Sequence, residues 1–94
     1  MYHPTPDSPV YDHLLELKES LGPRYNRRDR ATIMIGACIE TGFNTRYKII
    51  KGLRVAGLSN NLVVGILDEQ TGTVPGLHLW RCDDEGRYHL LDPI

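Results

Sequence analysis

Residues 42–57 read GFNTRYKIIKGLRVAG, and this stretch decides how the rest of the chain is interpreted. Asn44 or Thr45 is suited to cap a helix, because a short polar side chain accepts a hydrogen bond from the first free backbone N–H groups. Gly57 is suited to end that helix in the left-handed conformation. Apolar residues recur between them at helical spacing: Ile49, Ile50, Leu53 and Ala56. The stretch therefore predicts an amphipathic helix over about 45–56 with a basic outer side.

The next fifteen residues repeat this plan. Gly57-Leu58-Ser59 follows the same order as Gly42-Phe43-Asn44, namely glycine, a large apolar residue and a polar capping residue. This predicts a turn followed by a second helix over about 59–71, whose buried side is formed by Val63, Ile66 and Leu67. Helix, short turn and helix is the plan of a helix-turn-helix.

Two further helices are predicted upstream. Residues 9–21 carry an apolar stripe at helical spacing, with Ser8 as the expected N-cap. Residues 31–41, after a basic connector in which Asn26 or Asp29 is a possible cap, are apolar on nearly every side, which is typical of a central helix. Glycines lie inside three of the predicted helices, and close helix–helix packing is the main explanation, with close approach of a ligand or DNA backbone as the alternative: Gly36, Gly52 and Gly65.

The C-terminal part reads as a β-hairpin. Thr73-Val74-Pro75-Gly76 predicts a turn, and LHLWRCD and GRYHLLD then flank Asp84-Glu85. A type I turn from Asp83 to Gly86 sets Trp80 opposite Leu90 and Cys82 opposite Tyr88, so that these four share one face over the helical core. The predicted fold is α+β and mostly α, with four short helices followed by a C-terminal β-hairpin; residues 1–8 form a lead-in and 9–94 a single domain. The expected core is Leu14, Leu17, Ile33, Ile35, Ala37, Ile39, Ile50, Leu53, Val63, Ile66, Leu67 and Trp80.

Length and composition restrict the classes of protein. A chain of 94 residues is large enough for one core without a disulfide or metal. No apolar run approaches the roughly 20 residues that cross a bilayer, so no membrane partner is expected. Cys38 and Cys82 lie in apolar or strand-like contexts and are expected to be buried, reduced thiols, for which the cytoplasm is the default compartment.

Charge is segregated along the chain although its net value is only −1. Residues 24–54 carry eight Lys or Arg against two acids, whereas the flanking segments are acidic. Such a distribution can form one basic face, which is what a phosphate backbone would contact. The alternative is a set of solvated helix faces, which is what most charge runs are.

The helix-turn-helix followed directly by a two-stranded ribbon resembles the winged-helix family of DNA-binding domains. The resemblance covers residues 31–91, and in AGLSNNLVVGIL the positions of Gly57, Val63 and Ile66 match the turn glycine and two core residues of the motif, whereas Leu53 stands where alanine is most common. It implies that residues 59–71 are the recognition helix, with Asn60 and Asn61 available to adenine edges, and that the hairpin tip is the wing. Asp68, Glu69 and the acidic tip depart from this pattern, because carboxylates repel phosphates.

A second assignment of the helix-turn-helix avoids this repulsion between carboxylates and phosphates. In this second register the motif consists of helices 31–41 and 45–56, which are also joined by a short turn. In that register the basic helix enters the groove, and both registers serve if helix 45–56 crosses the backbone. We therefore expect a small DNA-binding protein, a transcriptional or mobile-element regulator, that acts on double-stranded DNA as a homodimer. Chain size and spare apolar surface near Tyr2, Tyr11 and Phe43 favour the dimer. The candidate DNA contacts are Arg27, Arg28, Asn44, Thr45, Arg46, Lys48, Lys51, Arg54, Asn60 and Asn61.

Other chemistry finds little support in the sequence. His78, Cys82 and His89 lie close together, but the predicted register puts His89 and Cys82 on opposite faces, so no metal site is expected. There is no phosphate loop or nucleophile motif, so neither a cofactor nor catalysis is expected. The alternative function is a protein-interaction module or inhibitor that uses an acidic face formed by helix 59–71 and the hairpin tip.

Overall fold

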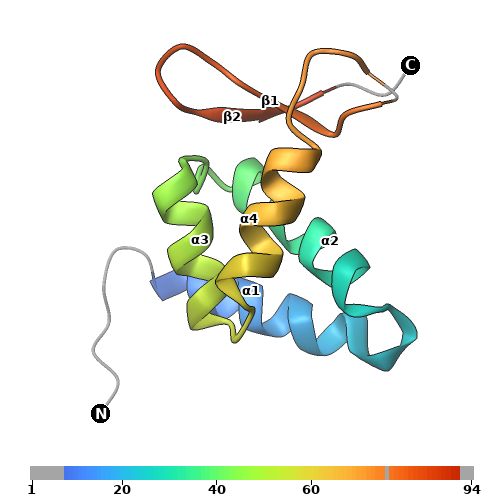
Figure 1. Ribbon diagram of the computed structural model, residues 1–94. Coiled ribbons are helices and arrows are strands. Elements are labelled where there is room, and N and C mark those ends of the chain that lie inside the picture. Colours follow the sequence, from blue (N-terminus) through green and yellow to red (C-terminus); the bar gives the residue numbers. More distant parts are fainter. Residues whose placement is uncertain (1–7, 76, 92–94) are drawn as a thin grey trace.

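A computed structural model describes residues 8–75 and 77–91 of the chain. The helices are α1 (Ser8–Leu21), a 3-10 turn η1 (Gly22–Arg24), α2 (Arg27–Glu40), α3 (Arg46–Val55) and α4 (Asn60–Glu69). They are followed by β1 (Trp80–Cys82) and β2 (Tyr88–Leu90), which form one antiparallel hairpin across the end of the helical bundle (Figure 1). The α+β, mostly α fold with four helices and a C-terminal hairpin is confirmed. The predicted lead-in falls almost wholly outside the described residues.

The helix α2 is central, as its composition predicts, and packs against α1, α3, α4 and β2. Its buried side is formed by Ala31, Met34, Ile35, Cys38 and Ile39. The prediction that Ile33 belongs to the core is wrong, because its side chain is 38% exposed and Met34 is buried instead. A helix that is apolar on nearly every side does not indicate which side its neighbours cover. Asn26 caps α2, its side chain accepting a hydrogen bond from the backbone N–H of Asp29 at 2.7 Å.

The glycines that follow α2 and α3 end these helices in the left-handed conformation, which favours glycine because it lacks a Cβ. Gly42 has φ +87° after α2, and Gly57 has φ +92° after α3. In both turns the N–H two residues beyond the C-cap donates to a carbonyl five residues earlier, Phe43 to Cys38 and Leu58 to Leu53, each at 2.9 Å. Each of these bonds satisfies a carbonyl that would otherwise be left free at the end of its helix. The two turns lead the chain from α2 into α3 and from α3 into α4.

Only one of the three helix-interior glycines serves close packing. A Cβ at Gly52 would lie 3.1 Å from the ring of Phe43 and 3.4 Å from Leu14, so its absence lets these side chains reach α3. At Gly36 and Gly65 nothing lies within 4 Å of such a Cβ, and the expectation of close packing there is wrong.

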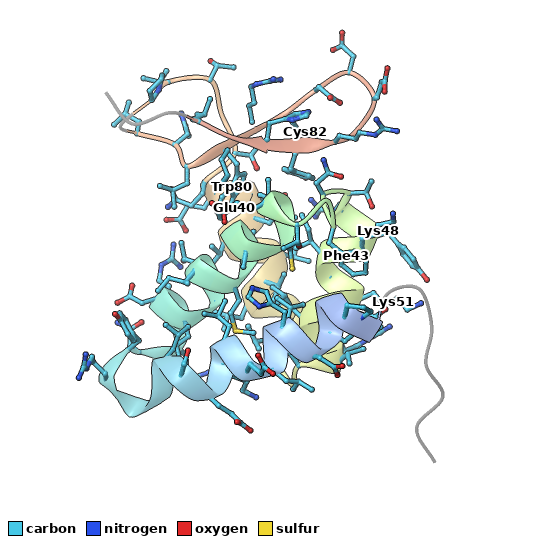
Figure 2. The ribbon with its side chains drawn as sticks, turned by 180° about the vertical axis from the view of Figure 1, so that it is seen from behind. Glu40, Phe43, Lys48, Lys51, Trp80 and Cys82 are labelled. Atoms are coloured by element: carbon cyan, nitrogen blue, oxygen red, sulfur yellow. The ribbon has the colours of Figure 1, made fainter. Side chains whose placement is uncertain are left out.

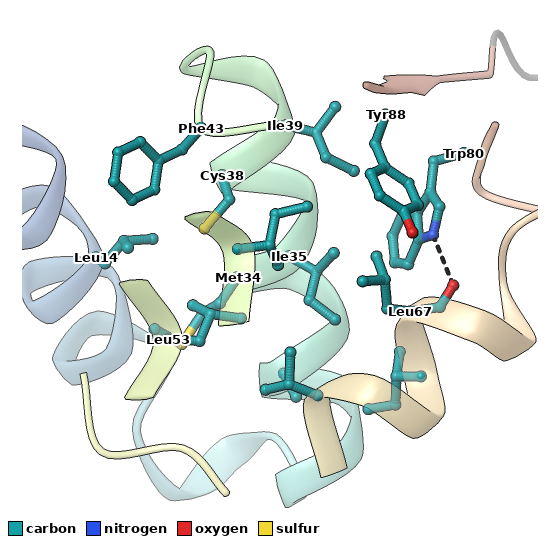
Figure 3. Close-up of a cluster of buried hydrophobic side chains, with 14 of the residues drawn as sticks. Leu14, Met34, Ile35, Cys38, Ile39, Phe43, Leu53, Leu67, Trp80 and Tyr88 are labelled. Carbon is teal, nitrogen blue, oxygen red and sulfur yellow. Dashed lines mark hydrogen bonds between the residues drawn. The ribbon is translucent and has the colours of Figure 1, made fainter. Parts of the chain in front are cut away.

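The core lies between the four helices and the inner face of the hairpin (Figure 3). Of the predicted core residues, Leu17, Ala37 and Ile50 are only partly buried and pack at its edge. Besides the buried side of α2, the fully or nearly buried residues are Leu14, Phe43, Ile49, Leu53, Ala56, Val63, Ile66, Leu67, Trp80 and Tyr88. Tyr11 meets Phe43 edge-on, with ring centroids 5.7 Å apart, and Phe43 is only 4% exposed. The idea of spare apolar surface around Phe43 is therefore wrong, and Tyr2 lies outside the described residues.

The hairpin has the predicted register, with Trp80 opposite Leu90 and Cys82 opposite Tyr88. Only Trp80 and Tyr88 are buried, however, while Cys82 and Leu90 are exposed. The prediction of a buried Cys82 is wrong, because the ribbon touches the helices along one diagonal rather than over its whole face. The indole Nε1–H of Trp80 donates to the Leu67 carbonyl at 3.1 Å, which fixes β1 on the end of α4 (Figure 3).

In the predicted turn before β1, the N–H of Leu77 donates to the carbonyl of Val74 at 3.1 Å. Gly76, which belongs to this predicted turn, lies outside the described residues.

Candidate nucleic-acid interface

The helix α3 carries the main group of basic side chains. Its N-cap is Thr45, whose hydroxyl accepts from the N–H of Lys48 at 3.3 Å, while Ile49, Gly52 and Leu53 form its buried side. Its ten residues, RYKIIKGLRV, contain no acid. Burial of the apolar stripe therefore leaves a basic outer side formed by Arg46, Lys48, Lys51 and Arg54.

Two of these cations rest against aromatic rings. The ammonium of Lys48 lies 5.8 Å from the ring centroid of Phe43, and that of Lys51 lies 5.7 Å from the ring centroid of Tyr47, a side chain that is 70% exposed. At these distances the ring attracts the cation. Lys48 and Lys51 lie along the same outer side of α3 (Figure 2). Arg54 is exposed one turn further along, and no ion pair within the described residues involves any of the three.

The acids of α4 are paired with two of the predicted contact residues. Arg46 donates to both carboxylate oxygens of Asp68, at 2.6 and 3.2 Å, and Arg28 lies 2.5 Å from the carboxylate of Glu69. The hydrogen bond between Arg46 and Asp68 raises the pKa of Arg46 and lowers the pKa of Asp68. These side chains are about half exposed, so each pair contributes only about 0–1 kcal/mol to stability. The two ion pairs therefore offset the negative charge at the end of α4.

Asn44 and Thr45 hold the hairpin. The carbonyl of Asn44 accepts from the N–H of Tyr88 at 2.7 Å, and its side-chain amide donates to the carbonyl of Tyr88 at 3.3 Å. Thr45 forms an antiparallel bridge with Arg87 in addition to capping α3. These two residues therefore tie the start of α3 to β2.

Asn60 and Asn61 lie in the first turn of α4, and both are exposed. Ser59, not an asparagine, caps this helix by accepting from the N–H of Leu62 at 3.4 Å. No side-chain hydrogen bond is formed by either asparagine within the part of the chain that the structure describes. Both amides are therefore open to a ligand beside the end of α3.

Arg27 is exposed at the first position of α2. With Lys18 of α1 and Arg30 of α2 it lines one cavity, and of these residues only Lys18 is unexpected from the sequence, because Arg30 belongs to the same basic segment as Arg27. Lys18 is a single cation on an otherwise acidic helix, so no sequence pattern indicates this meeting. Its ammonium donates to the carbonyl of Ala56 at 2.7 Å, which attaches α1 to the end of α3.

The hairpin tip is organised around Asp83. One of its carboxylate oxygens accepts from the N–H groups of Glu85 and Arg87, and the other lies 2.8 Å from Nε2 of His89. The hydrogen bond with His89 and then those from the backbone lower the pKa of Asp83 to about 2. Asp84 and Glu85 stay exposed, and Arg87 lies 3.8 Å from Glu85. The tip is acidic, as its sequence indicates.

Two further observations concern residues 8–75 and 77–91. They contain no group of three or more His, Cys, Asp or Glu placed to hold a metal ion. None of their helices has both the length and the apolar character required to cross a bilayer.

Comparison of the chain with protein-family models, with curated proteins and with solved structures finds no match.

Proposed function

We propose that this protein binds duplex DNA through the basic outer side of α3. The observation that carries the proposal is the group Lys48, Lys51 and Arg54, three cations at successive spacings of three residues on a helix without acids. Residues three apart on a helix are neighbours on its surface. Since none of them is engaged with a carboxylate within the described residues, all three are available to phosphate oxygens.

In this proposal α3 crosses the backbone and the start of α4 reaches the base edges. Asn60 and Asn61 are exposed immediately after the α3–α4 turn, and asparagine recognises adenine through paired hydrogen bonds. Gly65 lies one turn beyond Asn61 with open space around it, so the outer surface of α4 is flat at that point. The pairing of Asp68 with Arg46 and of Glu69 with Arg28 reduces the repulsion that these acids would exert on phosphates.

The order of the elements supports the resemblance to winged helices. A short extended segment between α2 and α3 pairs with the hairpin, through the Thr45–Arg87 bridge and the Asn44–Tyr88 bonds. It widens the ribbon on the side of β2. The role in regulation, the homodimer and the cytoplasmic location belong to this proposal, and the unpaired thiols of Cys38 and Cys82 suit a reducing compartment. No catalytic step is assigned.

The test is binding to duplexes of random sequence as a function of salt. Lys48→Ala, Lys51→Ala and Arg54→Ala should each weaken binding to all sequences and reduce the slope of log K against log salt by about one unit. Arg24→Ala is the matched control, because Arg24 is an exposed cation that lies on η1, across the bundle from α3 (Figure 1). Asn60→Ala and Asn61→Ala should instead relax the preference for particular bases. Undetectable binding at low salt, or equal losses in Arg24→Ala, would refute the proposal.

The second candidate function is docking on another protein. Its supporting observation is apolar exposure in the segment that leads into β1, where Leu77 is 74% exposed and Leu79 44% exposed. Duplex binding that is undetectable or indifferent to the three α3 cations would favour this candidate.

A further inference from the structure

Three basic side chains from two helices meet at one cavity, on the side of the α3–α4 turn. The cavity has a volume of about 200 Å³. Lys18 of α1 and Arg27 and Arg30 of α2 form its charged wall. The turn at Gly57–Ser59, together with Met34 of α2 and Leu62 of α4, forms the remainder.

The charge in this cavity is uncompensated. No carboxylate is among its lining residues, and none of its three cations takes part in an ion pair within the described residues. Arg28 and Arg46, by contrast, each face an acid. Like charges gathered at one cavity repel each other, and a bound anion converts that repulsion into attraction.

One donor at the cavity is held in place by the backbone. Lys18 donates one hydrogen bond to the carbonyl of Ala56. An ammonium has three donors, so two remain. Its Nζ lies 2.8 Å from the point that a Cβ on residue 57 would occupy, so the ammonium fits there because that residue is glycine.

The chemistry of the wall selects the ligand. Two guanidinium groups provide planar pairs of donors that match phosphate oxygens, and an ammonium adds a point charge. The floor is apolar, with Met34 fully buried and Leu58 and Leu62 half-buried. The volume exceeds the roughly 30 Å³ share of one water several times, but it is below the roughly 300 Å³ at which ordinary ligand pockets begin. The cavity suits a phosphate group with a small apolar substituent.

We propose that this cavity is a binding site for a phosphate group, with Lys18, Arg27 and Arg30 as its donors. The site goes beyond the DNA-binding proposal and does not depend on it, because Lys48, Lys51 and Arg54 do not line the cavity. The phosphate can belong to a free phosphomonoester or to a nucleic-acid backbone, and the two sources differ in the experiment.

The experiment is a titration followed by the backbone amide signals of the isotope-labelled full chain. Phenyl phosphate should shift the amides of Gly57, Ser59 and Leu62 with saturation near about 1 mM. Inorganic phosphate should shift the same amides more weakly, because it lacks the apolar part. Sodium chloride at equal ionic strength should not produce this pattern. If chloride reproduces it, or if phenyl phosphate shows no saturation by about 10 mM, the site is refuted.

Variants assign the site to its donors. The double change Arg27→Gln and Arg30→Gln should weaken the binding of phenyl phosphate by at least about tenfold, because two charged hydrogen-bond donors are lost. Arg81→Gln is the control, since it removes one exposed cation from β1, away from the cavity. Equal affinities of the double variant and the control would refute the assignment. If the double variant does not fold, Arg27→Gln alone and the comparison with chloride on the unchanged chain still decide the matter.

A further titration, with a duplex, distinguishes the two sources of the phosphate. A duplex that shifts the same amides and displaces phenyl phosphate identifies a backbone phosphate as the ligand. A duplex that binds but does not displace phenyl phosphate identifies a free phosphomonoester as the ligand. If no duplex binds at all, the DNA-binding proposal fails while the phosphate titration still tests the cavity.

Discussion

Trp80 attaches the hairpin to the helices, so replacing it measures how strongly the two parts depend on each other. Its side chain is the largest of those that are fully buried, and its indole donates to the Leu67 carbonyl at 3.1 Å. A Trp80→Ala change removes both the packing and the bond, and changes of this kind cost about 3–5 kcal/mol. A domain of 94 residues has about 5–14 kcal/mol of stability in total, so a substantial share is lost.

The conservative change separates packing from the hydrogen bond. Trp80→Phe keeps an aromatic ring but loses the indole N–H. The Leu67 carbonyl still accepts from the hydroxyl of Thr71, so it is not left unsatisfied. The bond itself then contributes about 0.5–1.5 kcal/mol, and with the smaller ring we expect a total loss of about 1–3 kcal/mol.

Urea denaturation followed by far-UV circular dichroism is the appropriate assay, because Trp80 is the only tryptophan and fluorescence is lost with it. The slope of free energy against urea should stay constant if only stability changes. Leu77→Ala is the control, since that side chain is 74% exposed and its removal should change stability by no more than about 0.5 kcal/mol. If Trp80→Ala costs no more than Leu77→Ala, the hairpin does not pack on the helices and the fold described above is wrong.

Three further predictions concern single positions. In the native protein a thiol reagent should modify Cys82, which is exposed, and spare Cys38, because Cys38 is fully buried and burial raises the pKa of its thiol to about 12. A Cys82→Ser variant that still reacts with the reagent before it unfolds would contradict the packing of α2. The folded-state pKa of Asp83 is depressed, so the stability that its carboxylate contributes is present above about pH 4 and is lost as pH falls towards about 2. The difference in melting temperature between the wild type and Asp83→Asn should therefore narrow over that interval. A difference that does not change with pH would show that the charge of this carboxylate does not stabilise the fold. Gly36→Ala should stabilise the protein by up to about 1 kcal/mol because its surroundings are open, whereas Gly52→Ala should give no gain because its Cβ would lie 3.1 Å from Phe43; equal melting temperatures of the two variants would refute this contrast.

Features that depend on short segments could be predicted from the sequence. The left-handed glycines Gly42 and Gly57 end their helices because few other residues accept that conformation. The pairing of Cys82 with Tyr88 follows from the turn between them, since the loop fixes the register. Both depend on residues a few positions apart, so no knowledge of the rest of the fold is needed.

Features that depend on how elements meet could not be predicted in this way. The sequence does not indicate that Met34 rather than Ile33 faces the core, because both are apolar and the rotation of α2 is set by three other helices. The exposure of Cys82 depends on the angle at which the ribbon crosses α2 and α4. The meeting of Lys18 with Arg27 and Arg30 at one cavity depends on how α1 packs against α2 and α3, and no spacing along the chain encodes it.

The ion pairs change how the charges of the chain should be counted in the DNA-binding proposal. By sequence, α4 ends in two acids, and residues 24–54 hold eight cations whose positions in space are unknown. In the fold, Arg46 and Arg28 are taken up by Asp68 and Glu69, because the start of α3 and the start of α2 both reach the end of α4. The two paired carboxylates then repel a phosphate less strongly. The unpaired cations of α3 lie on one helix that carries no acidic residue. The same pairing that removes two expected DNA contacts therefore leaves a more uniform basic surface for the other three.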